Sequence, residues 1–168
     1  KTIETEQALL GAIVLDPSIL DKLAISSKVF FSDAHQILFR AMRGLGPNRL
    51  DQLTLIEVLE SKGKLKEIGG ELYIVELARN CPFMGNWETY EAIINDKYQR
   101  REILTQAEAL ARAALDEGEN VNKAIAEIMT EVVTSAQPLK GTVHISEVAR
   151  RLYEKVEERA KDPKEIYG

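Results

Sequence analysis

The sequence predicts an all-α protein with three parts: a compact multi-helix head, a long antiparallel helical hairpin and an appended amphipathic linker helix. Three observations support this fold class. Apolar residues recur at helical spacing along nearly the whole chain, and the strict apolar–polar alternation of half-buried strands is absent. Glycines and prolines gather at a few junctions. Neither occurs from residue 86 to 117, which allows one helix of about 30 residues, ~45 Å long.

The first 50 residues predict three helices. The first spans residues 3–15, with Glu4 and Glu6 in its first turn, where carboxylates complement the positive end of the helix dipole. It ends at Asp16-Pro17, a pair that can start a short second helix with Asp16 as the N-cap. Ser32 caps the third helix, which ends at the Gly44–Pro47 breaker. The apolar stripes of the first and third helices are formed by Ala8, Leu9, Ala12, Ile13, Ile37, Leu38, Ala41 and Leu45.

Two further helices complete the head. A helix near Leu55–Ser61 ends at Gly63, because glycine adopts the left-handed conformation that closes helices. After Gly69-Gly70, a strand at residues 72–75 is one alternative, but the helical spacing continues and favours a helix. The apolar residues at this spacing are Tyr73, Ile74, Leu77 and Ala78. Pro82 and Gly85 end the head, which we assign to residues 1–85.

Residues 86–136 predict a helical hairpin. Asn86 caps a helix that runs to Glu117, Gly118 ends it, and Asn120 caps a second helix through Ser135. A short loop between two helices makes them antiparallel. The second helix carries more apolar surface than one seam can bury, so we expect a second copy of the chain to cover it. The predicted self-association residues are Leu104, Ala107, Ala111, Ala114, Val121, Ile125, Ile128, Met129, Val132 and Val133.

Residues 137–168 predict a linker with one amphipathic helix. Its apolar stripe covers three turns and consists of Ile145, Val148, Ala149, Leu152, Tyr153 and Val156. An isolated helix of about 10–14 residues is marginal in water, so we expect this stripe to dock in a groove of a partner. The polar stretch from Lys161 to Gly168 has no cap, and we expect the natural chain to continue into another domain.

Composition narrows the possible functions. The 22 Lys and Arg against 27 Asp and Glu give a net charge of −5, which weighs against a sequence-independent DNA-binding protein. The single cysteine, Cys81, cannot form an internal disulfide and fits a cytoplasmic location. No apolar run approaches the ~18 residues of a membrane span.

Catalytic and metal-binding patterns find no support. The phosphate-binding pattern G-x-x-x-x-G-K-[ST] does not occur, and His35 and His144 lack the spacing of zinc or di-iron ligands. We interpret His35 as a structural hydrogen-bonding group, and Cys81 has no neighbouring histidine to activate it. The densest basic cluster is Lys97 with Arg100-Arg101, which we interpret as a solvated face pairing with Asp96 and Glu102. We therefore predict no catalytic, cofactor-binding or metal-binding residue.

An ordered set of motifs resembles the N-terminal domain of DnaB-type replicative DNA helicases. Residues 4–11 (ETEQALLG) resemble that family's E-x-E-Q-x-x-L-G opening, and Val29-Phe30-Phe31, Ala34-His35 and Ile37-Leu38-Phe39 are similar to its "DF…H…IF" stretch. The likeness continues through residues 51–55 (DQLTL) with Leu59, then residues 68–73 (IGGELY), and then Asn86, Tyr90, Lys97 and Arg101. It covers about residues 2–135 in order, and residues 145–168 resemble the linker helix and the approach to the ATPase domain.

The resemblance implies an assembly role. In this family heads and hairpins associate in pairs, and three pairs build a collar on a hexameric motor ring. Primase docks on the collar, and the linker helix packs on a neighbouring subunit's motor domain. The RecA-like ATPase domain, with its Walker loop and arginine finger, is absent from these 168 residues. ATP and magnesium are therefore expected only outside them. The basic arm that often precedes the first helix is also missing, and the loop at residues 44–49 is short. Bacterial and phage origins both fit.

Three alternatives remain open at this point. The first is a helical DNA-binding domain of a replication protein that uses Lys97, Arg100, Arg101 and Arg112. The second is a small enzyme, although no nucleophile, base or phosphate loop is visible. The third is a stand-alone scaffold or loader-interacting protein that never had a motor. Salt-dependent binding of single-stranded DNA, ATP turnover and a Gly-Lys-Thr loop beyond Gly168 would distinguish them.

Overall fold

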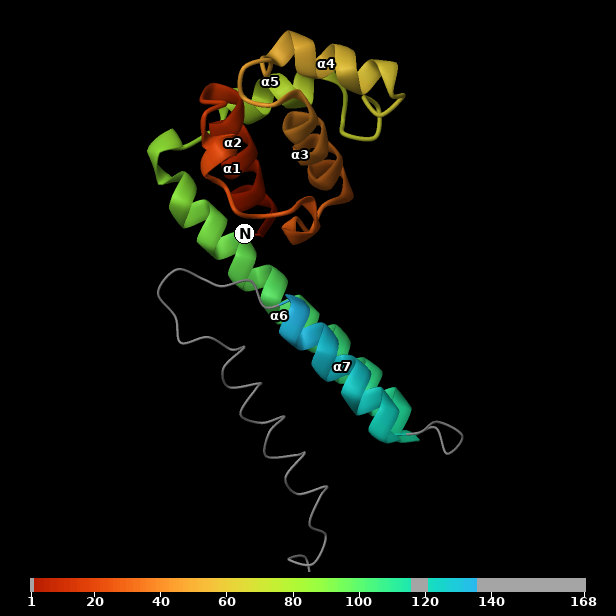
Figure 1. Cartoon of the computed structure of the whole chain (residues 1–168). Coiled ribbons are helices and arrows are strands. Elements are labelled where there is room, and N and C mark those ends of the chain that lie inside the picture. The colour runs from red at the N-terminus through yellow and green to blue at the C-terminus, as the bar shows by residue number, and fades with distance from the viewer. Residues whose placement is uncertain (1, 116–120, 136–168) are drawn as a thin grey trace, which may run out of the picture. The chain divides into compact units, whose positions relative to one another are not determined.

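The computed structural model describes residues 2–115 and 121–135, which form helices and connecting loops without a strand (Figure 1). This confirms the predicted all-α class. The elements in chain order are α1 (Thr2–Leu15), α2 (Ile19–Lys22), η1 (Ser27–Val29), α3 (Asp33–Leu45), α4 (Gln52–Ser61), α5 (Glu71–Arg79), η2 (Met84–Asn86), α6 (Trp87–Leu115) and α7 (Val121–Ser135).

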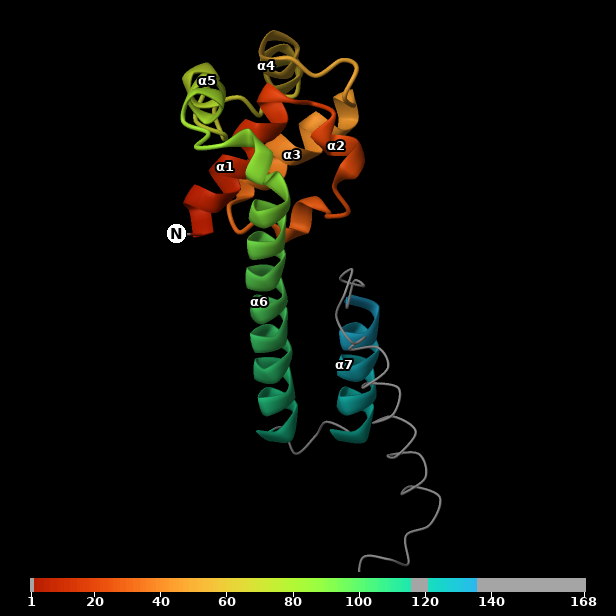
Figure 2. The same cartoon turned by 90° about the vertical axis from the view of Figure 1, so that its left-hand side faces the viewer.

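The chain divides into two compact units, residues 1–100 and 101–168. The boundary lies inside α6, so the first half of this helix belongs to the first unit. In the second unit, α7 runs in the opposite direction to the second half of α6, as the hairpin prediction requires (Figure 2). The predicted ranges 1–85, 86–136 and 137–168 stay predictions, because they divide the chain by function as well as by packing.

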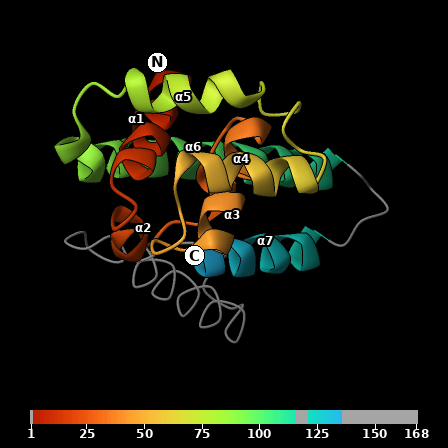
Figure 3. The ribbon, with the colours of Figure 1, turned by 90° about the horizontal axis from the view of Figure 1, so that it is seen from above.

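Helix α1 lies at the centre of the first unit and contacts α2, α3, α5 and η2 (Figure 3). Every residue from Ala8 to Val14 is buried, so the helix has no solvent-facing side over two turns. A helix that is apolar all round belongs in a core. The predicted stripe of four residues therefore understated how deeply α1 is buried.

Gly11 permits a close approach between α1 and α5. A Cβ atom built on Gly11 would lie 2.1 Å from the carbonyl oxygen of Leu77 and 3.1 Å from the Cβ of Cys81. The first distance is far shorter than any real contact, and the atom it meets belongs to the backbone. Only glycine fits here.

Helix α4 begins earlier than predicted and ends as predicted. It starts at Gln52, because the Asp51 carboxylate accepts hydrogen bonds from the Thr54 N–H (2.9 Å) and hydroxyl (2.7 Å). At the other end, Gly63 has a φ of 65°, its N–H donates to the Glu60 carbonyl, and the Lys64 N–H donates to the carbonyl five residues before it. This pair of bonds is a Schellman motif. The glycine prediction is confirmed.

The start of α2 needs correction, whereas the other predicted ends lie close to the observed ones. The short α2 starts at Ile19 rather than at Pro17, because the Asp16 carboxylate accepts from the N–H and hydroxyl of Ser18 and thereby caps a turn before the helix. Helix α3 runs to Leu45 and is closed by Gly46, which has a φ of 72° and lies within the predicted Gly44–Pro47 breaker. Asn86, the predicted cap of α6, is the last residue of η2 and directly precedes Trp87, the first residue of α6. The predicted end at Glu117, stop at Gly118 and cap at Asn120 lie outside the described residues.

Candidate interaction surfaces and a buried polar network

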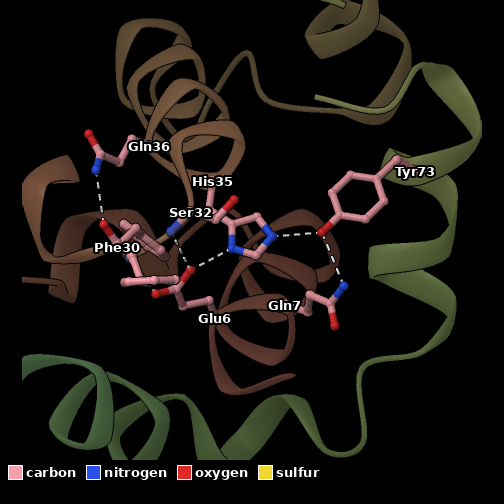
Figure 4. A network of polar contacts seen from close by, with 8 residues as sticks. Glu6, Gln7, Phe30, Ser32, His35, Gln36 and Tyr73 are labelled. Atoms are coloured by element: carbon pink, nitrogen blue, oxygen red, sulfur yellow. Dashed lines mark hydrogen bonds and ion pairs between the residues drawn. The ribbon is translucent and has the colours of Figure 1, made fainter. Parts of the chain in front are cut away.

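A buried carboxylate joins α1 to the start of α3. Glu6 is fully buried, and its two oxygens accept hydrogen bonds from the backbone N–H groups of Phe31 (2.5 Å) and Ser32 (3.3 Å) (Figure 4). The Nδ1 atom of His35, a side chain that is only 1% exposed, lies 2.6 Å from the same carboxylate. Burying a carboxylate is costly unless several donors satisfy it, and here three do. Glu6 therefore ties the two helices together, whereas the sequence analysis placed it in the first turn as a complement to the helix dipole, a turn in which α1 has only Glu4.

The network continues from His35 to α5. The Nε2 atom of His35 lies 2.6 Å from the Tyr73 hydroxyl, and the Gln7 side-chain amide donates to that hydroxyl at 3.1 Å (Figure 4). A hydroxyl can donate one hydrogen bond and accept two, so Tyr73 can bind Gln7 and Nε2 of His35 at the same time. The predicted structural role of His35 is confirmed.

This network ties three helices together through satisfied polar contacts. Among the described residues, no buried side-chain nitrogen or oxygen lacks a partner, and no three His, Cys, Asp or Glu side chains gather as metal ligands would. Glu6, Gln7, His35 and Tyr73 all belong to the motifs that carry the family resemblance. Those motifs therefore encode the packing of α1, α3 and α5.

Sequence reasoning missed a second tie, made by Arg43 near the end of α3. Its Nη1 donates to the carbonyl of Leu20 (2.8 Å), and its Nη2 donates to the carbonyls of Leu23 (2.7 Å) and Ile25 (3.4 Å). The guanidinium also lies 5.2 Å from the ring centroid of Phe39. An arginine in the last turn of a helix usually interacts with that helix's own dipole, so its sequence position gave no signal for this role.

Cys81 is poorly suited to nucleophilic chemistry. Its half-buried thiol lies 3.6 Å from the carbonyl oxygen of Ala8, and burial raises its pKa above the ordinary thiol value. A raised pKa reduces the thiolate fraction that would react.

Within the described residues, no helix is both long and apolar enough to cross a bilayer.

Within the basic cluster on α6, Arg100 forms a solvated ion pair. Arg100 donates from Nε to the Asp96 carboxylate at 2.9 Å, and both side chains are more than half exposed. This pair was predicted, and the attraction lowers the pKa of Asp96 below its ordinary value. Arg112 donates to the carbonyl of Glu108 in its own helix.

The predicted self-association residues divide into three groups. On α6, Leu104 is 62% exposed, and the three predicted alanines are also exposed, at positions Ala107, Ala111 and Ala114. On α7, the three predicted side chains that the structure describes are half-buried: Ile125, Ile128 and Met129. The third group lies outside the described part and consists of the side chains of Val121, Val132 and Val133. The predicted linker-helix residues also lie outside it: Ile145, Val148, Ala149, Leu152, Tyr153 and Val156.

Helix α6 also exposes apolar residues that the sequence analysis did not select. Ile103 is 60% exposed, Leu110 is 39% exposed and Leu115 is 84% exposed. Ile103 and Leu110 are seven residues apart and so share a helix face with each other. This spacing is visible in the sequence, although the predicted set of residues did not include these two. The apolar surface of α6 in the second unit is therefore wider than predicted.

Curated relatives of this chain are replicative DNA helicases. The chain is 38% identical over 119 residues to the replicative DNA helicase DnaB of Buchnera aphidicola subsp. Baizongia pistaciae (strain Bp), an alignment that covers 68% of this chain and 26% of that protein. It is 29% identical over 167 residues to the replicative DNA helicase DnaC of Bacillus subtilis (strain 168), covering 94% of this chain and 36% of the relative. The chain thus spans about a quarter to a third of the relatives' length.

Solved structures agree with this relationship. The N-terminal domain of DnaB helicase from Mycobacterium tuberculosis superposes with a TM-score of 0.69 and 25% identity, covering 76% of this chain and 96% of that one. A structure described as a DnaB-like replicative helicase and its interactions with primase gives a TM-score of 0.63 at 19% identity, covering 92% of this chain and 34% of that one, which shows the shared fold. Residues 1–96 match the family model of the DnaB-like helicase N terminal domain, and the chain therefore belongs to the DnaB family.

Proposed function

We propose that this chain is the collar domain of a replicative DNA helicase, which assembles subunits through its hairpin, docks primase and performs no chemistry of its own. The observation that carries the assembly role is the exposed apolar surface of α6 in the second unit. Ile103 and Leu104 are both about three-fifths exposed at 60% and 62%, and Leu115 is exposed more fully. Adjacent large apolar side chains left in water favour burial against another protein surface.

The occupant we propose for this surface is the hairpin of a second copy. Helix α7 contributes half-buried Ile125, Ile128 and Met129, so both helices of the hairpin offer apolar side chains. Homodimer interfaces are richer in apolar surface than the rest of a protein, and a two-fold axis lets the same patch serve both subunits. Pairs of this kind, three to a ring, would form the collar of a hexamer.

Sedimentation tests the pairing. Sedimentation equilibrium of the chain across the micromolar range should show self-association. Ile125→Asp combined with Ile128→Asp should abolish it, because each carboxylate would be desolvated without a partner. Ala126→Asp is the matched control: this residue is exposed on the same helix, so an added charge there should leave association intact. A wild-type chain that stays monomeric at high micromolar concentration would contradict the pairing. So would equal loss of association in the control variant.

The primase role is supported by the solved relative whose description names interactions with primase. A direct test is binding of the chain to the primase from the same organism by calorimetry, with the double variant of α7 alongside. If the double variant loses both primase binding and self-association, primase binds the paired form of the chain. Binding that survives the double variant would place the primase surface on a single copy, and no binding at all would contradict the docking role.

The remaining parts of the proposal concern residues outside the described part. The amphipathic stripe at residues 145–156 is proposed to dock on a neighbouring motor domain in the cytoplasm. ATP and magnesium are proposed to bind only in that motor domain. Among the described residues, no three His, Cys, Asp or Glu side chains could hold a metal ion together, and Arg100 of the basic cluster pairs with Asp96.

A further inference from the structure

Helices α4 and α5 carry the most exposed apolar side chains of the first unit. Leu53 on α4 and Leu72 on α5 are each 67% exposed, more than any other large apolar side chain described there, and Val75 on α5 is 41% exposed. The two helices pack against each other at one side of the unit (Figure 1, Figure 3). Leu72 and Val75 are three residues apart and therefore adjoin on their helix. The packing of the first unit leaves this apolar area in water.

Three exposed carboxylates on the same helices accompany these apolar side chains. Glu57 and Glu60 follow Leu53 by four and seven residues, and Glu76 follows Leu72 by four, so each shares a helix face with a leucine. The ion pairs among the described residues involve none of the three. Glu60 and Glu76 lie in the last four residues of their helices, where the negative end of the helix dipole disfavours a carboxylate. Local helix stability therefore does not account for these acids.

Every other carboxylate described in the first unit has a position or a partner that accounts for it. Five lie in the first turn of a helix and complement its dipole, namely Glu4, Asp21, Asp33, Glu71 and Glu88. Six accept hydrogen bonds, namely Glu6, Asp16, Asp51, Glu67, Glu91 and Asp96. The acids of the first unit that have neither role are thus confined to α4 and α5.

The charge on α4 and α5 is predominantly negative. Together with Glu71, the two helices present four exposed carboxylates against one exposed base, Arg79. The lysines of this region lie in the connecting loop, and Lys64 is paired there with Glu67. A negative surface repels the phosphates of nucleic acids and anionic lipids, whereas it attracts lysine and arginine side chains. The charge therefore favours a basic protein partner.

We propose that the outer face of α4 and α5 binds an amphipathic helix of a partner protein, whose apolar anchors are flanked by lysine or arginine. This α4–α5 face consists of Leu53, Glu57, Glu60, Leu72, Val75 and Glu76. The apolar side chains of the partner cover the leucines and the valine, as in other helix-in-groove complexes. The carboxylates pair with the flanking cations at the rim, where charge complementarity selects and orients a partner. The proposal stands independently of self-association, which rests on residues of the second unit.

Fluorescence anisotropy of a labelled model peptide tests the face in the whole chain. The probe is a helical peptide of about 14 residues, with leucines at the spacing i, i+3, i+4 and i+7 and lysines at the other positions. A second peptide has the same leucines and carries glutamate in place of lysine. The lysine peptide should bind, and its affinity should fall as salt is added, because salt screens exposed charges. The glutamate peptide should bind at least about tenfold more weakly.

Two leucine variants test the apolar anchors. Leu72→Ser should weaken binding of the lysine peptide by about tenfold, because the partner loses the apolar surface that it buries. Leu15→Ser is the matched control, since Leu15 is also exposed (50%) in the first unit but lies at the end of α1. This variant should leave the affinity unchanged.

Two double variants test the charges. Glu57→Gln combined with Glu76→Gln should weaken binding by about threefold to tenfold at low salt, because two rim ion pairs are lost. Asp21→Asn combined with Glu88→Gln removes the same charge from exposed positions on α2 and α6, and it should change the affinity by less than about twofold. Circular dichroism confirms that each variant is folded.

Several outcomes would overturn the proposal. A lysine peptide that does not bind, or a glutamate peptide that binds equally well, would exclude a basic helix as the occupant. Equal weakening by a face variant and its control would mean that the acidic chain attracts the peptide without a defined site. If Leu72→Ser also abolished self-association in sedimentation, a second copy would be the occupant instead. A failure of the α7 variants to dissociate the chain would leave this proposal unaffected.

Discussion

Gly11→Ala is the sharpest test of how the first unit is packed. In most helices this change stabilises, because alanine has the higher helix propensity by about 1 kcal/mol. At position 11 the added methyl carbon would lie 2.1 Å from the Leu77 carbonyl oxygen, and this oxygen cannot rotate away as a side chain would. Helices α1 and α5 must then separate by about 1 Å to restore an ordinary contact, and a gap of this size forfeits up to about half of each dispersion contact across it.

The expected cost follows from these two terms. Overpacking a core typically costs about 1–3 kcal/mol, and we take about 3 kcal/mol here because the clash is with backbone. The gain in helix propensity offsets about 1 kcal/mol. The net destabilisation is therefore about 2 kcal/mol, which lowers the midpoint of thermal unfolding of the 100-residue first unit by about 8–16 °C.

Trp87 supplies the assay. It is the single tryptophan of the chain and packs half-buried against the core of the first unit, so its fluorescence reports the unfolding of that unit in urea. Gly44→Ala is the control, because Gly44 lies inside α3 and no atom lies within 4 Å of the position its Cβ would take. That variant should be more stable than the wild type by about 0.5–1 kcal/mol.

The two glycines thus carry opposite predictions for the same substitution. If Gly11→Ala and Gly44→Ala raise the urea midpoint equally, α1 and α5 do not approach as closely as described. If both substitutions lower the urea midpoint, Gly44→Ala is not a valid control, because another effect then outweighs helix propensity at position 44. Only loss at position 11 with gain at position 44 supports the packing.

Other side chains give further predictions. Asp51→Ala should lower the urea midpoint near neutral pH, and the difference from wild type should disappear in acid. Hydrogen bonds from Thr54 lower the pKa of Asp51. The stabilisation by Asp51 is therefore present above the ordinary carboxylate pKa and is lost as the pH falls through the lowered pKa. Tyr73→Phe should cost about 1–3 kcal/mol in urea unfolding, because the buried Nε2 of His35 loses its partner. Arg43→Met keeps the apolar stem but should cost about 2 kcal/mol, since the carbonyls of Leu20, Leu23 and Ile25 lose a charged donor.

The helices were predictable where local chemistry decides them. Gly63 ends α4 through its own left-handed backbone, and helical spacing correctly favoured a helix over a strand at residues 72–75. The start of α4 is also determined locally, because Asp51 and Thr54 have the spacing of an N-cap and its donor. The predicted start near Leu55 did not take this pair into account. Signals that act within four residues can be read from one sequence.

The long-range ties were not predictable in this way. The role of Glu6 depends on Phe31, Ser32 and His35, which lie 25 to 29 residues away. A glutamate near a helix start is normally solvated, and nothing adjacent to it in the sequence announces a buried acceptor. Arg43 reaches back about 20 residues in the same manner. Of the sequence observations, only the family resemblance singled out the residues of the Glu6 network, and it did not explain what these residues do in the fold.

Family membership and self-association rest on different residues. The motifs that carry the resemblance include Glu6, His35 and Tyr73, whose side chains meet inside the first unit and fix its packing. The surface proposed for association includes Ile103 and Leu104, which lie in the second unit, outside those motifs and outside the matched residues 1–96. A relative can therefore keep the first unit intact while its hairpin diverges. For this reason the α7 variants test assembly alone, and a monomeric result would leave both the fold and the family assignment in place.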